Sequence, residues 1–421
     1  MSTSTTFIAD PERIFTICEG KNGFHSLVNL LSSQEKDHRN FLRLEQTICQ
    51  LDFDFYNDLL PKIAQWASDH TQAKSIELLH AGATRTVVYT AAQARYILAN
   101  AFFLNVLPGY GNISLNHLYN SFDEDLSIAR IRCLIEYFRL SSEEKDLDRE
   151  ISIERYFYQD ELPDWSQKRI PIRSSKVCVN TNRMEDSIDA EGFVDFANKH
   201  IHIHQIIPSA TQEEVLCKQQ LRNFHKLHLY FNVLVSCCPE AFLAILVCET
   251  LLDKEIVILR GCKRFVDYTG YADTFAYKEH YTRSGRIQDI LVLDACYSGQ
   301  FSKENIDRDL GKAWAGFEKS KDSIIATGNW GCGVFGGDLI FKFLQQLCAA
   351  TIINEKLQRL DYSAYHDDSL ATKLKTLLVS LEEKNKTVAD VYQMMQNYRK
   401  SAQFPGSRLL FSDYVNNWLN E

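Results

Sequence analysis

The sequence lacks the features that mark membrane-spanning, secreted and zinc-binding proteins. It contains no run of 18 or more apolar residues, which excludes a membrane-spanning helix. Its first residues, MSTSTTFIADPERIF, do not form a basic region followed by an apolar core, so no signal peptide is visible. The 12 cysteines are scattered and include no Cys-x-x-Cys pair, which is typical of free thiols in a reducing compartment. We therefore expect an intracellular protein, cytoplasmic or nuclear, that makes no membrane contact.

An excess of positive charge is also absent. The chain carries 46 Lys and Arg residues against 55 Asp and Glu residues, a net charge of −9, which argues against sequence-specific nucleic-acid binding through a basic face. An anionic ligand remains compatible with this charge where backbone N–H groups supply a local positive field. No internal repeat and no low-complexity segment occurs, and a hydrophobic content of 45% suffices for a large core.

Two parts of the chain differ in their residue patterns. Residues 1–165 predict a mainly helical domain, whose clearest helix begins at the capping box of Thr90 and Gln93 and runs toward Pro108-Gly109. In residues 166–421, β-branched runs alternate with amphipathic ones, which predicts an α/β fold with a mixed sheet, helices on both faces, and ligand sites at the carboxyl ends of the strands. The predicted strands are 174–180, 192–197, 200–207, 255–261, 289–295 and 323–329; the predicted helices include 127–140, 211–235, 239–252, the run after Gly337 and 387–400.

The most specific motif is ATGNWGCGVFGGDL, residues 326–339. A β-branched strand enters a loop that contains Gly331, Gly333, Gly336 and Gly337, and an amphipathic run follows at once. Glycines allow backbone N–H groups to approach a ligand closely, and a strand, glycine loop and helix in this order form a cradle for a diphosphate. The motif is neither a Walker loop nor a G-x-G-x-x-G dinucleotide fingerprint. The alternative is a tight connection between strand and helix without a ligand.

The stretch HIHIHQIIPSATQEE, residues 200–214, raises the question of a metal site. In an extended strand the outer histidines, His200 and His204, would lie roughly 13 Å apart, too far for one ion to bind all three. We therefore expect no metal here. Thr211 and Glu214 have the spacing of a capping box, so a strand that leads into a helix also explains these residues.

A second candidate for chemistry is DILVLDACYSGQ, residues 289–300. An apolar strand that ends in Asp-Ala-Cys resembles the nucleophile strand of caspase-like cysteine peptidases, with Cys296 as the nucleophile. That family carries its base in a His-Gly pair, which this chain lacks, and His280 does not stand at a strand end. A cysteine peptidase is therefore kept only as a minor alternative.

Five segments taken together resemble the poly(ADP-ribose) glycohydrolase family. They occur in the family's order: LANAFF (98–103), VDFAN (194–198), QEE (212–214), YTGYADT (268–274) and ATGNWGCGVFGGD (326–338). The resemblance implies a macrodomain-like, ADP-ribose-binding catalytic domain over residues 166–421, with a helical accessory domain before it. It also implies a hydrolase that needs no cofactor or metal and reverses ADP-ribosylation. Its partner would be poly(ADP-ribose) or an ADP-ribosylated protein.

The resemblance assigns roles to single residues. Glu214 matches the acid that protonates the glycosidic leaving oxygen, Glu213 the glutamate that binds the ribose and substrate hydroxyls, and Asn198 the residue that orients the terminal ribose. The remaining matches are expected to bind the substrate: Asp195 as a polar contact; Gln212, Met184 and Glu185 at the adenine; Asn329, Gly331, Gly333, Phe335 and Gly336 at the diphosphate; Tyr271 at the phosphates; and Tyr365 against the adenine.

One segment departs from the family pattern. Where the family has three consecutive glycines before QEE, this chain has His202-Ile203-His204. Histidine and β-branched isoleucine resist positive φ and fill space that glycine leaves open. Three outcomes are compatible with this change: cleavage of an ADP-ribosyl bond, binding of ADP-ribose with weak or no turnover, or loss of the ligand.

Overall fold

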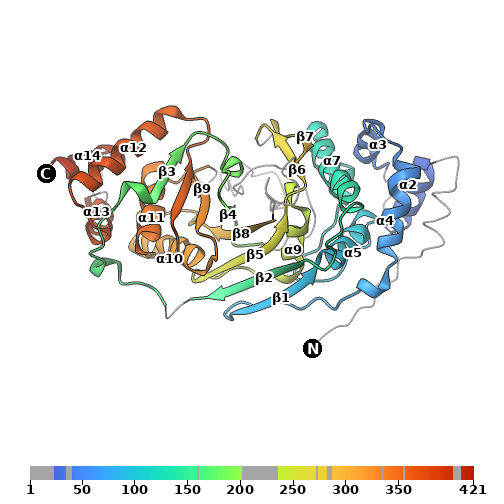
Figure 1. The fold of residues 1–421 in the computed structure, drawn as a ribbon, viewed down its shortest axis with the longest axis horizontal. Coiled ribbons are helices and arrows are strands. Elements are labelled where there is room, and N and C mark those ends of the chain that lie inside the picture. Colours follow the sequence, from blue (N-terminus) through green and yellow to red (C-terminus); the bar gives the residue numbers. More distant parts are fainter. Residues whose placement is uncertain are drawn as a thin grey trace, which may run out of the picture.

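The computed structural model describes residues 23–34, 40–158, 161–201, 236–271, 274–281, 287–333, 335–353, 356–401 and 409–421. Its centre is an eight-stranded sheet in the order β1-β2-β5-β8-β4-β9-β10-β3 (Figure 1). The strands are β1 (Arg85–Thr90), β2 (Glu150–Phe157), β3 (Val177–Asn180), β4 (Gly192–Ala197), β5 (Glu255–Lys263), β8 (Ile287–Asp294), β9 (Ile324–Gly328) and β10 (Arg359–Ser363). A separate hairpin is formed by β6 (Val266–Thr269) and β7 (Ala276–His280).

The sheet has a parallel part and an antiparallel part. Strands β8, β4, β9, β10 and β3 pair in parallel, whereas β1, β2 and β5 add antiparallel strands beyond β8. The centre of β8 is covered on both faces and is therefore a continuous apolar run, Ile290–Leu293. Five of the six predicted strands are present as β3, β4, β5, β8 and β9.

Helices gather on two sides of the sheet (Figure 1). On one side lie α2 (Gly23–Gln34), α3 (Leu42–Cys49), α4 (Leu60–Ala67), α5 (Ala91–Phe102), α6 (Asn116–Tyr119) and α7 (Glu124–Ser141), and on the other α10 (Lys303–Lys319), α11 (Leu339–Ile352), α12 (Asp368–Glu383), α13 (Val388–Ser401) and α14 (Phe411–Asn420). The predicted capping box is confirmed, because the Thr90 side chain accepts from Gln93 N–H and the Gln93 side chain accepts from Thr90 N–H. None of the helices in the described ranges is long and apolar enough to cross a membrane.

Two predicted helices are too long. The helix that starts at Ala91 ends at Phe102 rather than near Pro108, because Leu104 adopts a left-handed conformation with φ +61°. The predicted helix 239–252 is a 3₁₀ turn followed by α9 (Leu243–Val247), after which Cys248 pairs with Leu79 as a parallel bridge. Residues 239–248 are all buried, and an apolar segment that is covered on every side shows no periodicity that would mark where a helix stops.

The structure describes only the first two residues of the predicted strand 200–207 and none of the predicted helix 211–235. His200 and Ile201 lie beyond the end of β4 and belong to no strand. The rest of the predicted strand 200–207 and the predicted helix 211–235 lie outside the described residues.

Strands β1 and β2 come from the mainly helical first part of the chain. They extend the same sheet, and a single hydrophobic core includes residues from both parts. The sheet therefore crosses the predicted boundary between residues 165 and 166, and that boundary stays a prediction.

Candidate ligand-binding site at the carboxyl edge of the sheet

The parallel strands bring the candidate residues to one edge of the sheet. Ala197 of β4 lies beside Asp294 of β8, and Ser363 of β10 lies beside both Gly328 of β9 and Asn180 of β3. Strands β4 and β9 pair only over Gly192 and Phe193, so they separate toward their carboxyl ends. An open crevice between the carboxyl ends of parallel strands is the usual ligand position in such sheets.

A cavity of about 220 Å³ lies at this edge. Five of the predicted site residues line it: Met184, Tyr271, Asn329, Gly333 and Tyr365. Cys332 belongs to the predicted loop, and Tyr268 was an open candidate for either the core or a ligand slot; the remaining lining residues were not predicted as site residues: Phe196, Gly328, Leu339 and Ser363. A usable signal existed for Phe196, Gly328 and Ser363, because each stands at or next to the carboxyl end of a strand.

The glycine loop, defined here as residues 329–337, closes on itself through two backbone hydrogen bonds. Gly337 N–H donates to Gly331 O at 2.9 Å, and Gly336 N–H donates to Gly333 O at 3.0 Å. Gly331 has φ +72°, and a Cβ there would lie 2.5 Å from Ala295 Cβ, so only glycine fits. Within the described part of the chain, the N–H groups of Gly331, Gly333 and Phe335 donate no hydrogen bond. They remain available to an anionic ligand.

Side chains from two neighbouring elements hold the start of the loop. The hydroxyl group of Tyr362, in β10, donates a hydrogen bond to Asn329 Oδ1 at 3.0 Å. Gln346 of α11 donates from Nε2 to Gly328 O at 3.0 Å and accepts from the Thr327 hydroxyl at 2.6 Å. The end of the loop is held by the N-cap of α11, where the Asp338 carboxylate accepts from Phe341 N–H at 2.9 Å. The loop is thus fixed at both ends before any ligand binds.

Aromatic side chains line the cavity, and another stands in the glycine loop. The rings of Tyr271 and Tyr365 have centroids 5.5 Å apart, and Tyr365 holds a left-handed conformation with φ +42°. Phe335, in the glycine loop, contacts Tyr297 edge to face at 5.8 Å. Flat, apolar faces of this kind suit the adenine and ribose parts of a nucleotide.

Met184 and Glu185 lie together in a short 3₁₀ helix, Met184–Asp186, but face different cavities. Met184 lines the cavity described above, whereas Glu185 lines a separate cavity of about 270 Å³. The backbone carbonyl of Glu185 accepts from Arg264 Nη1 at 2.9 Å.

Asp195 and Asn198 are buried at the β4 end of the site. Asn198 follows the strand directly, and its Oδ1 accepts from His200 N–H at 3.0 Å. Asp195 stands inside β4, and among the described residues its Oδ1 has no hydrogen-bond partner. Burial raises the pKa of the Asp195 carboxyl to about 7.

This pKa predicts a pH-dependent stability. Asp195 has a pKa of about 7 when folded and an ordinary value of 3.8 when unfolded, so the folded state retains a proton that the unfolded state has lost between these values. The proton on Asp195 therefore makes its full contribution to the free energy of unfolding below pH 4. This contribution decreases by about 1.4 kcal/mol per pH unit as the pH rises toward 7.

The measurement is urea unfolding of the wild type and Asp195→Asn at several pH values. The wild-type free energy of unfolding should fall relative to that of Asp195→Asn between pH 4.5 and 7. Other buried carboxyls such as Asp322, whose pKa burial raises to about 6, contribute equally to both proteins and cancel in the difference. Parallel curves would show that Asp195 is ionised in the folded protein.

The catalytic candidates around QEE cannot be placed. Gln212, Glu213, Glu214 and the altered segment His202-Ile203-His204 all lie outside the described residues. Within the described ranges, no group of three or more His, Cys, Asp or Glu side chains is arranged to bind a metal ion.

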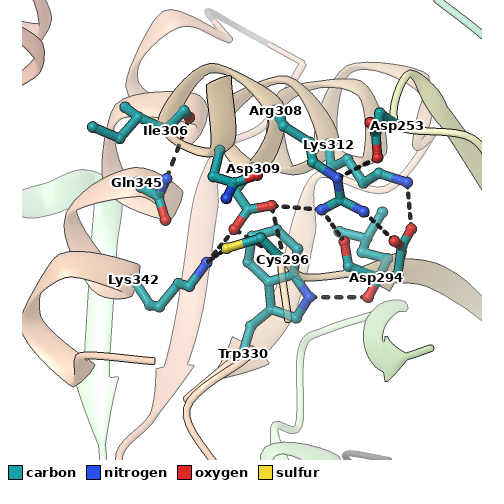
Figure 2. Close-up of polar contacts among 12 residues, drawn as sticks. Asp253, Asp294, Cys296, Ile306, Arg308, Asp309, Lys312, Trp330, Lys342 and Gln345 are labelled. Carbon is teal, nitrogen blue, oxygen red and sulfur yellow. Dashed lines mark hydrogen bonds and ion pairs between the residues drawn. The ribbon is translucent and has the colours of Figure 1, made fainter. Parts of the chain in front are cut away.

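Cys296 has the surroundings of a structural thiol rather than a nucleophile (Figure 2). It is buried, its Sγ lies 3.7 Å from Lys342 Nζ, and its N–H donates to the Asp309 carboxylate at 3.1 Å. Burial raises the pKa of the Cys296 thiol to about 12, so it stays protonated at neutral pH. His280 contacts Glu136 of α7 instead, at 2.7 Å. These features argue against the cysteine peptidase.

The fold is a macro domain fold with a helical domain before it. A sequence model described as the helical domain of poly(ADP-ribose) glycohydrolase matches residues 50–155. A second model, described as the macro domain fold of the same protein, matches residues 231–372, which include Tyr271, the glycine loop and Tyr365. Together they cover more than half of the 421 residues. The expected α/β, macrodomain-like fold class is confirmed.

The chain belongs to the poly(ADP-ribose) glycohydrolase family. It is 25% identical over 304 residues to poly(ADP-ribose) glycohydrolase 1 of Caenorhabditis elegans, which covers 66% of this chain and 36% of the relative. It is 26% identical over 230 residues to poly(ADP-ribose) glycohydrolase 2 of the same organism, covering 48% and 43%. With poly(ADP-ribose) glycohydrolase 1 of Arabidopsis thaliana it shares 23% identity over 372 residues, covering 68% and 63%. The chain thus spans between about a third and two thirds of these relatives' lengths.

Proposed function

We propose that the protein is a glycohydrolase that cleaves the ribose glycosidic bond of poly(ADP-ribose) or of another ADP-ribosyl conjugate and releases ADP-ribose. The observation that carries this proposal is the glycine loop, which stands at the carboxyl edge of the sheet inside the residues matched by the family's macro domain model. Its available N–H groups suit a diphosphate, and the aromatic side chains beside it suit the nucleoside.

In the proposed mechanism, one set of residues binds the substrate and another carries out the chemical step. The glycine loop holds the diphosphate, Tyr365 and Met184 contact the adenine, and Tyr271 contacts the phosphates. Phe335 stacks on the ligand, and Gln212 completes the adenine contact. Because the diphosphate and the adenine are held, the scissile bond has a fixed position relative to the catalytic acid. These contacts orient the substrate and take no part in the chemical step.

The chemical step itself needs a proton for the leaving oxygen. Cleavage at C1 of ribose passes through a state that resembles an oxocarbenium ion. In the proposal, Glu214 donates that proton and then accepts one from the attacking water, while Glu213 and Asn198 hold the ribose. Asp195, a buried carboxyl on β4 near Asn198, is a polar contact at the same end of the site.

The binding part of the proposal is tested by calorimetric titration with ADP-ribose. Binding by the wild type, weakened about tenfold in Phe335→Ala through the loss of one stacked ring, is the expected result. A flat titration of the folded wild type would remove the proposal.

A labelling experiment locates the ligand independently of any mutation. Cys332 is half-buried and lines the cavity, so ADP-ribose at ten times its Kd should slow alkylation of its thiol by iodoacetamide about tenfold. Peptide mass spectrometry follows the rate, and Cys178, an exposed thiol on β3, serves as the internal control. Equal protection of both cysteines, or of neither, would mean that ADP-ribose does not occupy this cavity.

A second candidate function is an ADP-ribose reader without turnover. One sequence feature favours it, namely His202-Ile203-His204 in place of the family's three glycines. Larger side chains there would crowd the ribose while leaving the diphosphate loop unchanged. A reader binds ADP-ribose in the titration above but releases none from a labelled polymer.

A further inference from the structure

A cluster of buried charges lies next to the glycine loop (Figure 2). We call Asp294, Arg308, Asp309, Lys312 and Lys342 the buried charge cluster. Lys342 of α11 pairs with Asp309 of α10, Arg308 bridges Asp309 at 2.7 Å and Asp294 at the end of β8, and Lys312 pairs with Asp294. The side chains of Lys312, Lys342 and Asp309 are 0% exposed.

The cluster carries one more positive charge than negative. It holds three cations and two carboxylates; Asp253, which pairs with Arg308 from the surface, is 80% exposed and screened by solvent. Burial alone would lower the pKa of Lys342, but Asp309 keeps it above its ordinary value. Lys312 donates to Leu252 O and Glu255 O, each at 2.9 Å, and to Asp294, which uses all three hydrogens of an ammonium group.

Lys342 is the member that touches the glycine loop. A Cβ at Gly337 would lie 3.2 Å from Lys342 Cε, and a Cβ at Gly331 would lie 3.4 Å from Cε and 3.8 Å from Nζ. The ammonium also lies 5.1 Å from the centre of the Trp330 ring. These positions put a desolvated positive charge beside the two glycines whose backbone hydrogen bond closes the loop.

We propose that Lys342 is a positioning residue for an anionic diphosphate. It holds the glycine loop from α11 and adds the field of a buried cation to the available N–H groups of Gly331, Gly333 and Phe335. This inference rests on the proposed function, because it takes ADP-ribose as the ligand of the loop. A fixed charge in a low-dielectric interior acts over several ångströms on a phosphate that it does not touch. A local positive field of this kind is compatible with the net charge of −9 on the whole chain.

Lys312 provides a matched control for this role. It is the other lysine of the cluster and is equally buried, but its contacts are with Asp294 and two backbone carbonyls. Lys312→Met therefore removes the same charge and the same hydrogen bonds to a carboxylate from a position that does not touch the loop. A variant that only disturbs the cluster should behave alike at both positions.

The test compares Lys342→Met and Lys312→Met in equilibrium binding of ADP-ribose and of uncharged adenosine. For Lys342→Met we expect a Kd for ADP-ribose about tenfold above that of Lys312→Met, a factor of ten being about 1.4 kcal/mol. The Kd for adenosine should differ by less than twofold. On polymer substrate KM should rise while kcat stays within about twofold, because ground-state and transition-state binding are affected equally.

Three results would overturn the inference. Equal ADP-ribose affinity in the two variants would show that the charge at Lys342 has no special role. An equal loss for adenosine and ADP-ribose would show a general distortion of the cavity. A wild type that binds no ADP-ribose would overturn the proposed function as well, which separates the two failures. If Lys342→Met does not fold, Lys342→Gln replaces it, because the amide can still donate to Asp309 without the charge, and the same outcomes apply.

Discussion

Replacing Glu214 with Gln should abolish the release of ADP-ribose from a labelled polymer while leaving ADP-ribose binding within a fewfold of the wild type. The amide has nearly the shape of the acid but cannot donate a proton and accept it back, and loss of a general acid typically costs 10²–10⁴-fold in rate. Polymer that carries a labelled terminal ribose, separated by chromatography after timed incubation, gives the rate directly.

The control for this prediction is the same chemical change at a distant site. Glu383, an exposed residue at the end of α12, should tolerate substitution with Gln without any effect on release. Equal, background release by the wild type and Glu214→Gln would remove the hydrolase from the proposal. If both proteins still bind ADP-ribose, the reader function takes its place, and His202-Ile203-His204 would then be the first segment to change back to glycines.

The second large effect is expected at Gly331. An alanine Cβ there would lie 2.5 Å from Ala295 Cβ at φ +72°, so the loop must move away from the end of β8. We expect Gly331→Ala to lower the free energy of unfolding by about 2–4 kcal/mol, from overpacking together with the left-handed conformation. Because the displaced loop no longer presents its N–H groups to the diphosphate, the Kd for ADP-ribose should rise by more than tenfold.

A substitution at Gly336 distinguishes the effect of overpacking from that of the left-handed conformation. Gly336 has a similar φ of +62°, but a Cβ there would meet no atom within 4 Å. Gly336→Ala therefore has only the conformational cost, about 1 kcal/mol, and should keep most of its affinity. Urea unfolding and calorimetry on both variants measure these differences. Equal effects at the two positions would show that contact with Ala295 does not determine the shape of the loop.

Much of the site was predictable from short patterns. The strand that ends in ATGN and the glycines after it predicted a loop at a strand end, and β9 and the glycine loop follow that pattern. Met184, Tyr271, Asn329, Gly333 and Tyr365, which the family resemblance singled out, lie around one cavity. The strand and its glycine loop were predictable because turn geometry and strand ends depend on neighbouring residues only.

Contacts between distant segments were not predictable in the same way. Strands β1 and β2 were not predicted, because they lie in a part of the chain whose pattern predicted helices. Their position in the sheet depends on the pairing of β2 with β5, which is about a hundred residues away in the sequence. The helix predicted for 239–252 ends at Val247 because the buried chain pairs with Leu79 instead. Such pairings depend on which segments come together in the folded protein, and local propensity does not predict them.

The order of residues alone was enough to indicate the α/β class from strand patterning and the family from the resemblance of short motifs. The diphosphate-binding residues that this resemblance implies stay a prediction. Only the folded arrangement revealed that Lys342, an unremarkable lysine in an amphipathic run, lies against Gly331 and Gly337 and is charge-paired to Asp309 from another helix. The reason is physical: a buried ion pair is defined by distance and dielectric, and both arise only when β8, α10 and α11 pack together.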